Sequence, residues 1–556
     1  MKYLLKNERA SKIFITCCSL AFIFMVFLIF SSDDPQLSSD KRFKSKILNK
    51  HRENSFFEPD LKCKHDKLMK EVQPIYLYEN VPVNLDATIS AERNRIAAGS
   101  SGSFKPIRFH VDYTNIERWR THHPEKVDFI VNHLVPTAIN YFERVITLYP
   151  FPKKIYSPVE ECVSATIPER LLFEGVRADF ILIIDGSDDY YDTYSAYSAP
   201  CAYSRQYFGR PFLGVLNYNL PFVSLAPANK WKRLSTTMHE LTHLLGFSER
   251  LFSSYVDPNG SPWGIDKVVK KSRLRGNSEG MVMILPLVAQ VARNHYGCKE
   301  LEGQEIESLG GSGSRGSHWE ARSLKSEILT AVNSPNRVYS NFTLALLEST
   351  GWYLPNYEYA QEIYWGKGKG CTFVEKTCEG DLFTEFCYTS DKSGCTFDNI
   401  GKSRCERNVE FFDTCFTNEG IDDGDCRYAQ NISDKAEVFG EGSRCIVSSI
   451  SAEPQKQNEA GKCYKHRCIS KNNKMTVEFE LKDGQRMLCD EPNKKIKAPS
   501  PWMGSLVCPS DINAFCKSKS PSTCPHNCWN NGICSSGVCL CNDGFEGDDC
   551  FKKKQG

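Results

Sequence analysis

The 556-residue sequence has almost no excess of charge of either sign. Lysine and arginine together number 69 and aspartate and glutamate 68, so the formal net charge is +1. Nucleic-acid-binding chains usually carry a strongly basic surface, so we expect no nucleic-acid partner. The sequence also has no tandem repeat of fixed period. Its last residues, FKKKQG, lack an apolar tail, so a GPI anchor is not expected.

Cysteine, in contrast, is abundant. The chain has 25 cysteines and is too long for one domain, which indicates several domains in an oxidising, secretory compartment. An apolar run over residues 13–30 follows several basic residues and precedes two aspartates. It is long for a signal-peptide core, short for a spanning helix and without an A-x-A cleavage pattern. We therefore predict either a signal peptide or a retained signal anchor over residues 1–30, the second giving a membrane contact.

Hydrophobic periodicity predicts a mixed α and β structure. Residues 107–113 alternate like a first strand, residues 127–148 have helical periodicity, and ADFILII (178–184) reads as a buried strand. The segment GRPFLGVLNYN (209–219) predicts another strand. It lies either beside a cleft, where an extended peptide could add hydrogen bonds to the sheet edge, or in the core.

The run TTMHELTHLLGFSERLF carries the strongest chemical signal. His239 and His243 are four residues apart, so on a helix they lie one above the other and can bind one metal ion. Glu240 between them is the candidate general base, with a solvated helix carboxylate as the alternative. Apolar residues recur every three or four positions, as on a helix packed against a core: Trp231, Leu234, Met238, Leu241 and Leu245. We expect the helix to end at Gly246 in a left-handed conformation.

A catalytic zinc needs a third protein ligand and an open position for water. In the compact pattern H-E-x-x-H-x-x-G-x-x-H the glycine matches Gly246, but Glu249 stands in place of the last histidine. Another candidate, His318, follows a Gly/Ser-rich segment. Glu249 and His295 are weaker candidates, and the alternative for His318 is a histidine in a surface loop.

At this point the sequence resembles the leishmanolysin family of metzincins. The matching stretches lie between about residues 105 and 370: HELTHLLGFS, LPLVAQVARNHYGC, GSHWE and SNFTLALLESTGWY. The resemblance implies an α+β, metzincin-type two-lobed catalytic domain with an inserted subdomain, which we place at residues 101–370. It also implies His318 as the third ligand of one Zn²⁺ ion. The methionine turn of metzincins falls on Leu329, and such a swap usually costs less than about 1.5 kcal/mol in a packed site.

These parts predict a zinc-dependent endopeptidase that acts on extracellular or lumenal proteins or peptides. Zinc would polarise the peptide carbonyl and lower the pKa of a water molecule, whose proton Glu240 would take. The alternative is a catalytically weak or inactive cell-surface adhesion protein on a metallopeptidase scaffold. Leu329 favours this alternative, whereas the retained histidines favour the enzyme.

An odd number of cysteines predicts one unpaired thiol, and the family resemblance implies that this thiol keeps a precursor of the enzyme latent. When Cys17 and Cys18 of the apolar run are set aside, 23 cysteines remain, so one thiol should stay unpaired. Cys63 in DLKCKHDK resembles the family's pro-segment motif, which implies a cysteine switch in which the thiolate occupies the open zinc position. The alternative is an ordinary disulfide. We place the pro-segment at residues 31–100, with cleavage in RNRIAAGSSGSF.

The C-terminal part changes to dispersed cysteines. We predict a Cys-rich domain at 371–520 that depends on disulfides more than on an apolar core. Residues 521–556 resemble an EGF-like module and basic tail, and the module suits cell-surface or matrix partners. The resemblance implies the pairs Cys524–Cys534, Cys528–Cys539 and Cys541–Cys550. With the apolar run, Cys63 and the module set aside, three cysteines precede residue 370 and thirteen follow it, so at least one bridge should join the two parts. Asn341 and Asn431 are candidate glycosylation sites, although Asn341 could instead lie near a helix start.

Overall fold

The computed structural model describes residues 63–71, 75–77, 104–191, 194–273, 275, 279–308, 315–332, 337–378, 383–390, 392–407, 415–427, 436–440, 442–454, 457–471, 474–517, 532–535, 538–542, 544–547, 550 and 552–554. The apolar run at 13–30, the expected cleavage region near residue 100, Asn431, Cys524 and Cys528 lie outside these ranges. Within them, no helix is both long enough and apolar enough to cross a bilayer.

A five-stranded sheet forms the first lobe of the predicted catalytic domain. Its order is β1 (Ile75–Leu77), β8 (Ala196–Ser204), β9 (Arg210–Asn219), β7 (Phe180–Ser187) and β3 (Phe109–Asp112). Strands β3, β7 and β9 are parallel, β8 is antiparallel to β9, and β1 is parallel to β8. The buried runs of β7 and β9 explain why these strands read as continuous apolar segments.

The position of β9 decides between the two readings of residues 209–219. Strand β9 has β8 on one side and β7 on the other, and all of its residues are buried. Its main-chain groups are therefore taken by neighbouring strands, so the edge-strand prediction was wrong and the core-strand alternative is confirmed. The edge strand on this side is the short strand β1, which pairs with β8 only at residues 202–204 of β8.

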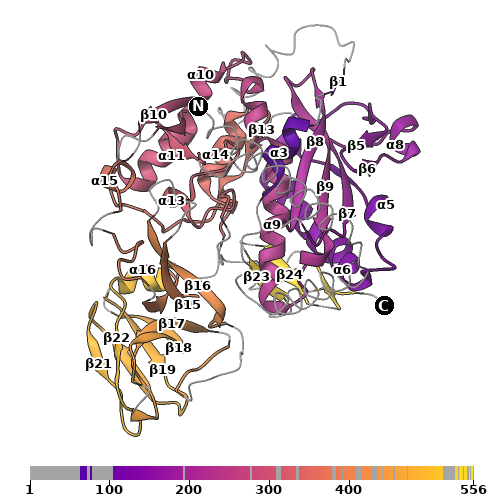
Figure 1. The fold of residues 1–556 in the computed structure, drawn as a ribbon. Helices are drawn as coiled ribbons and strands as arrows, with labels where there is room; N and C mark the ends of the chain where they lie inside the picture. Colours follow the sequence, from indigo (N-terminus) through magenta and orange to yellow (C-terminus); the bar gives the residue numbers. More distant parts are fainter. Residues whose placement is uncertain are drawn as a thin grey trace, which may run out of the picture. The chain divides into compact units, whose positions relative to one another are not determined.

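Helix α9 (Pro227–Leu245) carries the H-E-x-x-H run and lies alongside β8 and β9 (Figure 1). The predicted stripe is buried at Leu234, Met238, Leu241 and Leu245, while the side chain of Trp231 is not described. The helix ends before Gly246, as expected. However, Gly246 has φ 156° and ψ −18°, a positive-φ conformation that is not the left-handed helical one we predicted.

The helical periodicity over 127–148 is interrupted in the structure. It comprises α6 (Pro124–Phe129), a π-helical turn (Ile130–Leu134), α7 (Val135–Val145) and strand β4 (Ile146–Leu148). Pro136 has no backbone N–H, so the regular hydrogen bond to residue 132 cannot form. The wider π turn comes directly before it, with the Val135 N–H bonded to the Ile130 carbonyl.

The second lobe contains the inserted segment and the chain that follows it. Three of its strands form a sheet in the order β10-β11-β12, whereas β13 pairs with β4, and its longest helices are α11 and α14. The elements of this lobe are the 3₁₀ helix Glu249–Ser254, α10 (Ile265–Val268), β10 (Val269–Arg273), β11 (Glu279–Met283), α11 (Pro286–Tyr296), β12 (Gln304–Ile306), α13 (Ala321–Leu324), α14 (Asn341–Ser349) and β13 (Tyr353–Pro355). The smaller elements elsewhere are α3 (His65–Glu71), β2 (Lys105–Pro106), α5 (Thr114–Glu117), β5 (Glu161–Cys162), β6 (Ala165–Thr166), α8 (Glu169–Phe173), the 3₁₀ helices Leu220–Phe222 and Tyr357–Tyr359, and α15 (Cys371–Glu375). Asn341, the first residue of α14, is exposed.

The Cys-rich region has two sheets and an apolar core of its own. One sheet contains β14 (Ser393–Cys395), β15 (Gly401–Arg407) and β16 (Phe416–Asp425). The six-stranded sheet has the order β20-β19-β18-β17-β22-β21, and the remaining elements are β17 (Ser443–Ser448), β18 (Ala460–Lys471), β19 (Lys474–Glu480), β20 (Arg486–Cys489), β21 (Lys495–Lys497), β22 (Ser505–Val507) and α16 (Ile512–Lys517). The disulfide-rich character of this region is as predicted, but it also has more apolar core than we expected, with Tyr464, Val477 and Phe479 buried.

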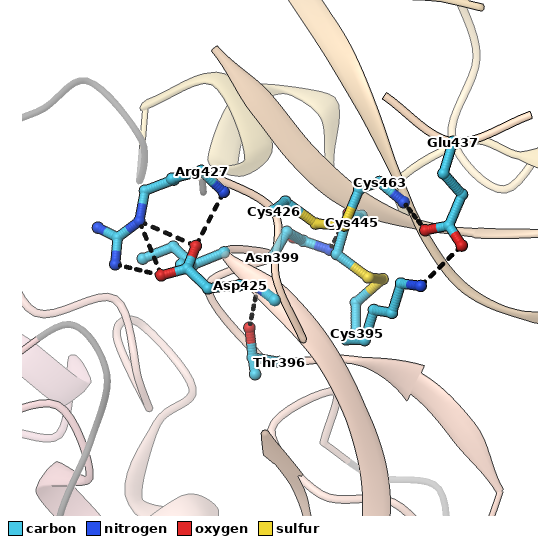
Figure 2. The surroundings of a disulfide bond; sticks show 12 residues. Cys395, Thr396, Asn399, Asp425, Cys426, Arg427, Glu437, Cys445 and Cys463 are labelled. Atoms are coloured by element: carbon cyan, nitrogen blue, oxygen red, sulfur yellow. Dashed lines mark hydrogen bonds and ion pairs between the residues drawn. A yellow bond between two sulfur atoms is a disulfide. The ribbon is translucent and has the colours of Figure 1, made fainter. Parts of the chain in front are cut away.

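Several disulfides cross-link this region. Figure 2 shows Cys395–Cys445 and Cys426–Cys463 close together, with Glu437 accepting hydrogen bonds from Lys402 and from the Cys463 N–H. The further bridges of this region are Cys378–Cys415, Cys387–Cys405, Cys468–Cys516 and Cys489–Cys508.

Two more bridges bear on the expected domain organisation. Cys162–Cys201 lies within the catalytic region, and Cys298–Cys371 joins that region to the Cys-rich part, which confirms the expected link. In the last module, which contains β23 (Gly532–Ser535), β24 (Val538–Cys541), β25 (Phe545–Glu546) and β26 (Lys552–Lys553), the pair Cys541–Cys550 is present as expected.

Candidate metal centre

Three histidines from two distant segments meet at one point. The Nε2 atoms of His239 and His243 are 3.1 Å apart, and each is 3.2 Å from Nε2 of His318. His239 and His243 come from successive turns of α9, whereas His318 lies just before α13, beyond the inserted segment. All three side chains are buried. The spacing argument thus brought the helical pair together, and the family resemblance identified the third histidine.

The outer nitrogens of the α9 histidines face main-chain carbonyls. Nδ1 of His239 is 2.6 Å from the Ile328 carbonyl oxygen, and Nδ1 of His243 is 2.7 Å from that of Phe247. A carbonyl only accepts, so each Nδ1 carries the hydrogen and each Nε2 lone pair points into the cluster. Burial holds the pKa of both imidazoles well below the ordinary value. Neutral imidazoles with convergent lone pairs are the form that binds a metal ion.

Glu240 lies on the same helix and is held by Ser198 of strand β8. The Ser198 hydroxyl is 3.0 Å from Oε2 of Glu240 and 2.8 Å from its main-chain oxygen. Burial raises the pKa of Glu240 to about 8, and the hydrogen bond from Ser198 offsets part of that rise. Glu240 is 2 % exposed, so it is not a solvated helix carboxylate.

Cys63 brings a fourth ligand-type atom to the cluster. Its Sγ is 3.7 Å from Nε2 of His243 and 3.8 Å from Oε1 of Glu240. Sγ and the three imidazole nitrogens all lie within 4.8 Å of one another. Among the described residues Cys63 is the free cysteine, as the odd cysteine number predicted.

The residues after Cys63 also contact the site. The His65 ring stacks on His243 at 4.2 Å between centroids, and its Nδ1 is 2.9 Å from the Ser198 carbonyl oxygen. Asp66 accepts a hydrogen bond from the Ser317 hydroxyl, and its Oδ2 is 3.8 Å from Nδ1 of His318. We call residues 63–71, which include α3, the Cys63 segment; Figure 1 shows α3 beside β8.

The weaker third-ligand candidates lie outside the cluster. The Glu249 N–H donates to the Ser317 hydroxyl, 2.9 Å away, so Glu249 supports the segment that carries His318. His295 lies on α11, where Nε2 is 2.9 Å from the Trp365 carbonyl oxygen. Neither residue belongs to the group of four around the imidazole nitrogens.

Leu329 lies in a buried turn next to the centre. The Thr330 N–H donates to the Glu327 carbonyl and closes a tight turn around residues 328 and 329. Leu329 is fully buried, and its neighbour Ile328 supplies the carbonyl that faces His239. A tight turn is thus present at the expected position with leucine in place of methionine.

Several contributors were not found from the sequence. Ser198 and the Ile328 carbonyl carry no sequence signal, because a serine in a strand and a main-chain oxygen look ordinary until the chain is folded. His65 and Asp66 were visible in the motif around Cys63, but their separate contacts were not predicted.

Comparisons with known proteins show the family to which this chain is similar. A family model described as leishmanolysin matches residues 121–410, more than half of the chain, and a model for an EGF-like domain matches residues 524–550. The leishmanolysin-like peptidase of Caenorhabditis elegans is 37% identical over 352 residues, covering 50% of this chain and 52% of that protein. The ciliated left-right organizer metallopeptidase of Xenopus laevis is 30% identical over 322 residues, which cover 57% of this chain and 43% of that protein. A leishmanolysin homolog of Crithidia fasciculata is 30% identical over 267 residues, covering 47% and 38% respectively. The chain thus spans about half the length of the C. elegans relative and less of the other two.

Proposed function

Because this chain belongs to the leishmanolysin family of metallopeptidases, we propose that it is a zinc-dependent endopeptidase synthesised as a latent precursor. The observation that carries the proposal is the convergence of the His239, His243 and His318 Nε2 atoms at 3.1–3.2 Å. Its substrates would be proteins or peptides in an extracellular or lumenal space, the setting that the EGF-like module and the disulfides indicate.

The ligand set fits zinc. Around a tetrahedral zinc with Zn–N bonds of about 2.05 Å, the nitrogens lie about 3.3 Å apart, and a sulfur at about 2.3 Å lies about 3.5 Å from each nitrogen. The separations of 3.1–3.2 Å between nitrogens and 3.7 Å from Cys63 Sγ to His243 Nε2 are close to these values. The three histidines would therefore hold one Zn²⁺ ion, with Cys63 as a fourth ligand in the precursor.

The residues around the proposed zinc site suit peptide hydrolysis. Bound zinc supplies a Lewis acid that polarises a peptide carbonyl and acidifies a water molecule. Glu240 would take the proton from this water at its carboxylate and pass it to the leaving amine. Ser198 fixes one carboxylate oxygen, so the other, Oε1, stays directed toward the position that the Cys63 sulfur takes. The Ser198 carbonyl would accept a main-chain N–H of an extended substrate once His65 has left it.

Latency would follow from the position of the Cys63 segment. Its thiol would occupy the open position of the bound zinc, where water must bind, and its His65 ring lies against the Ser198 carbonyl of β8. Arg250 also donates a hydrogen bond to the Met69 carbonyl and ties α3 to the residues after α9. Removal of the pro-segment would free both the open zinc position and the Ser198 carbonyl of β8.

Paired variants of the mature chain test the catalytic proposal. The wild type should contain one zinc per chain and cleave a general protein substrate such as casein, and a chelator should stop cleavage until zinc is returned. Glu240→Ala should keep the zinc and lose cleavage, whereas His318→Ala should lose both. A wild-type chain without zinc, or cleavage by Glu240→Ala at the wild-type rate, would contradict the proposal.

The EGF-like module supports a further part of the proposal. Such modules commonly mediate contacts outside the cell, so residues 524–550 would bind cell-surface or matrix partners. An uncleaved segment 1–30 would in addition hold the enzyme at a membrane. An inactive adhesion protein is the less favoured reading, because Glu240 and the three histidines are all retained.

A further inference from the structure

One buried carboxylate close to the proposed metal centre accepts several hydrogen bonds and has no part in the chemistry proposed above. Glu327 is fully buried. Its Oε2 accepts from the Leu329 N–H at 2.5 Å. Its Oε1 accepts from the Ser340 N–H at 3.3 Å, the Ser340 hydroxyl at 2.8 Å and the Thr343 hydroxyl at 2.6 Å. A single carboxylate thus satisfies four donors from two segments.

The first set of contacts leads to His239. The bond from the Leu329 N–H to Oε2 and the bond from the Thr330 N–H to the Glu327 carbonyl fix the turn between them. The Ile328 N–H is bonded to the Val338 carbonyl, so this peptide is anchored on its other side as well. The held turn presents the Ile328 carbonyl to Nδ1 of His239 at 2.6 Å.

The second set leads to His318. The Thr343 hydroxyl donates to Glu327 and accepts from the indole N–H of Trp319 at 3.0 Å. Trp319 directly follows His318, and its own main-chain N–H donates to the Leu329 carbonyl at 2.8 Å. The backbone on the C-terminal side of His318 is therefore fixed by the same carboxylate and the same turn.

We propose that Glu327 is the positioning residue of the metal centre. It holds the Ile328 carbonyl against His239 and Trp319 beside His318, and so fixes the orientation of two of the three imidazoles. The inference rests on the proposed zinc site. It also explains how Leu329 serves in place of methionine, because the turn is held by its hydrogen bonds to Glu327 and not by the chemistry of the buried side chain.

A purely structural role is the competing explanation. Ser340 is the N-cap of α14 and accepts from the Phe342 N–H at 3.2 Å, so Glu327 could simply brace the start of that helix. The two explanations differ in which contact matters. Positioning depends on the Leu329 and Thr343 contacts, whereas helix bracing depends on the Ser340 contact.

Three variants of the mature, zinc-loaded chain separate these roles. In Glu327→Gln the amide oxygen can take the place of Oε1 and keep its three donors, but the amide N–H₂ group then faces the Leu329 N–H and that bond is lost. Thr343→Val keeps the shape of residue 343 and removes the link to Trp319. Ser340→Ala removes the helix cap and leaves the Leu329 and Thr343 contacts in place.

The measurement is the rate at which a chelator removes zinc, followed beside the thermal unfolding midpoint of the metal-free chain. Loss of an outer-shell partner typically weakens metal binding by about 10- to 100-fold. We expect at least about tenfold faster zinc loss in Glu327→Gln and in Thr343→Val. Ser340→Ala should lower the unfolding midpoint of the metal-free chain and leave zinc loss within about twofold of wild type.

The outcomes are distinct. Wild-type zinc loss in both Glu327→Gln and Thr343→Val, or equally fast loss in Ser340→Ala, would overturn the inference. If Glu327→Gln does not fold, the comparison of Thr343→Val with Ser340→Ala decides alone. A wild-type chain that binds no zinc would instead overturn the proposed function, and that result is seen before any variant is made.

Discussion

If the Cys63 thiol alone kept the precursor inactive, the substitution Cys63→Ser would give full peptidase activity without cleavage of the chain. The structure predicts a partial release, because other groups of the Cys63 segment still bind the site. The His65 ring stacks on His243 and bonds the Ser198 carbonyl, Asp66 bonds Ser317, and the Met69 carbonyl bonds Arg250. The uncut Cys63→Ser precursor should therefore have a peptidase activity between those of the wild-type precursor and the mature enzyme. A second substitution in the segment should then raise that activity measurably.

The size of that second effect can be worked from the His65 contacts. One buried hydrogen bond contributes about 1 kcal/mol net, and a stacked ring pair about 0.5–1.5 kcal/mol more. Removing both costs about 2 kcal/mol, which corresponds to an increase of about 30-fold in the population of precursor with the segment undocked. His65→Ala added to Cys63→Ser should therefore raise peptide cleavage by up to about 30-fold over Cys63→Ser alone, as long as most molecules stay docked.

The assay is the initial rate on a fluorogenic peptide, with gels showing that the precursor remains uncut. Lys67→Ala is the matched control, because Lys67 is an exposed residue of the same helix. It should leave the rate of Cys63→Ser unchanged. The reasoning is refuted if His65→Ala has no more effect than Lys67→Ala, or if Cys63→Ser alone already equals the mature enzyme.

Three further results are expected. Ser198→Ala should lower kcat/KM of the mature enzyme by about tenfold with full zinc content, because Glu240 loses a hydrogen bond that orients it; Ser198→Thr should restore part of the rate, and loss of zinc instead would point to misfolding. His295 should make the fold less stable in acid, since burial lowers its pKa from 6.5 to about 4. The unfolded chain then binds the proton of His295 more tightly than the folded chain does. The contribution of His295 to stability is therefore intact above about pH 6.5 and is lost as the pH falls toward 4, by about 1–2 kcal/mol between pH 7 and pH 5 for this partly buried ring. Urea unfolding at both pH values should show an acid loss that is smaller by this amount in His295→Gln than in wild type, and equal acid losses would contradict it. Gly246→Ala should lower the unfolding midpoint by several degrees, because φ is 156° and a Cβ would lie 3.2 Å from Cγ2 of Thr350; an unchanged midpoint would show that the helix end can relax.

Much of the centre could be predicted because its chemistry is local in the sequence. His239 and His243 lie on successive turns of one helix with Glu240 between them, so the spacing of the motif alone places the two imidazoles on the same face. His318 is beyond the reach of that argument, since an inserted lobe separates it from α9, and only the resemblance to a family identified it. Cys63 was indicated by an odd cysteine number together with its motif.

The rest depends on contacts that only the folded chain creates. The strand 209–219 was correctly predicted as a strand, but whether a strand lies at an edge is decided by which partners pair with it, and β8 and β7 enclose β9. The helical periodicity over 127–148 did not indicate the π-helical turn that precedes Pro136. Ser198 and Glu327 are ordinary residues in the sequence, and they gain their roles from segments far along the chain. Of the three EGF-like pairs, Cys541–Cys550 is confirmed, while the other two stay predictions.

The central claim is that three imidazoles and one removable thiol surround a single zinc ion. Zinc X-ray absorption on the intact precursor and on the mature enzyme tests it most directly. The precursor should show three nitrogen neighbours at about 2.0–2.1 Å and one sulfur at about 2.3 Å, and the mature enzyme should show the nitrogens with oxygen in place of sulfur. A precursor whose zinc has no sulfur neighbour, or a His318→Ala chain with an unchanged zinc spectrum, would contradict it.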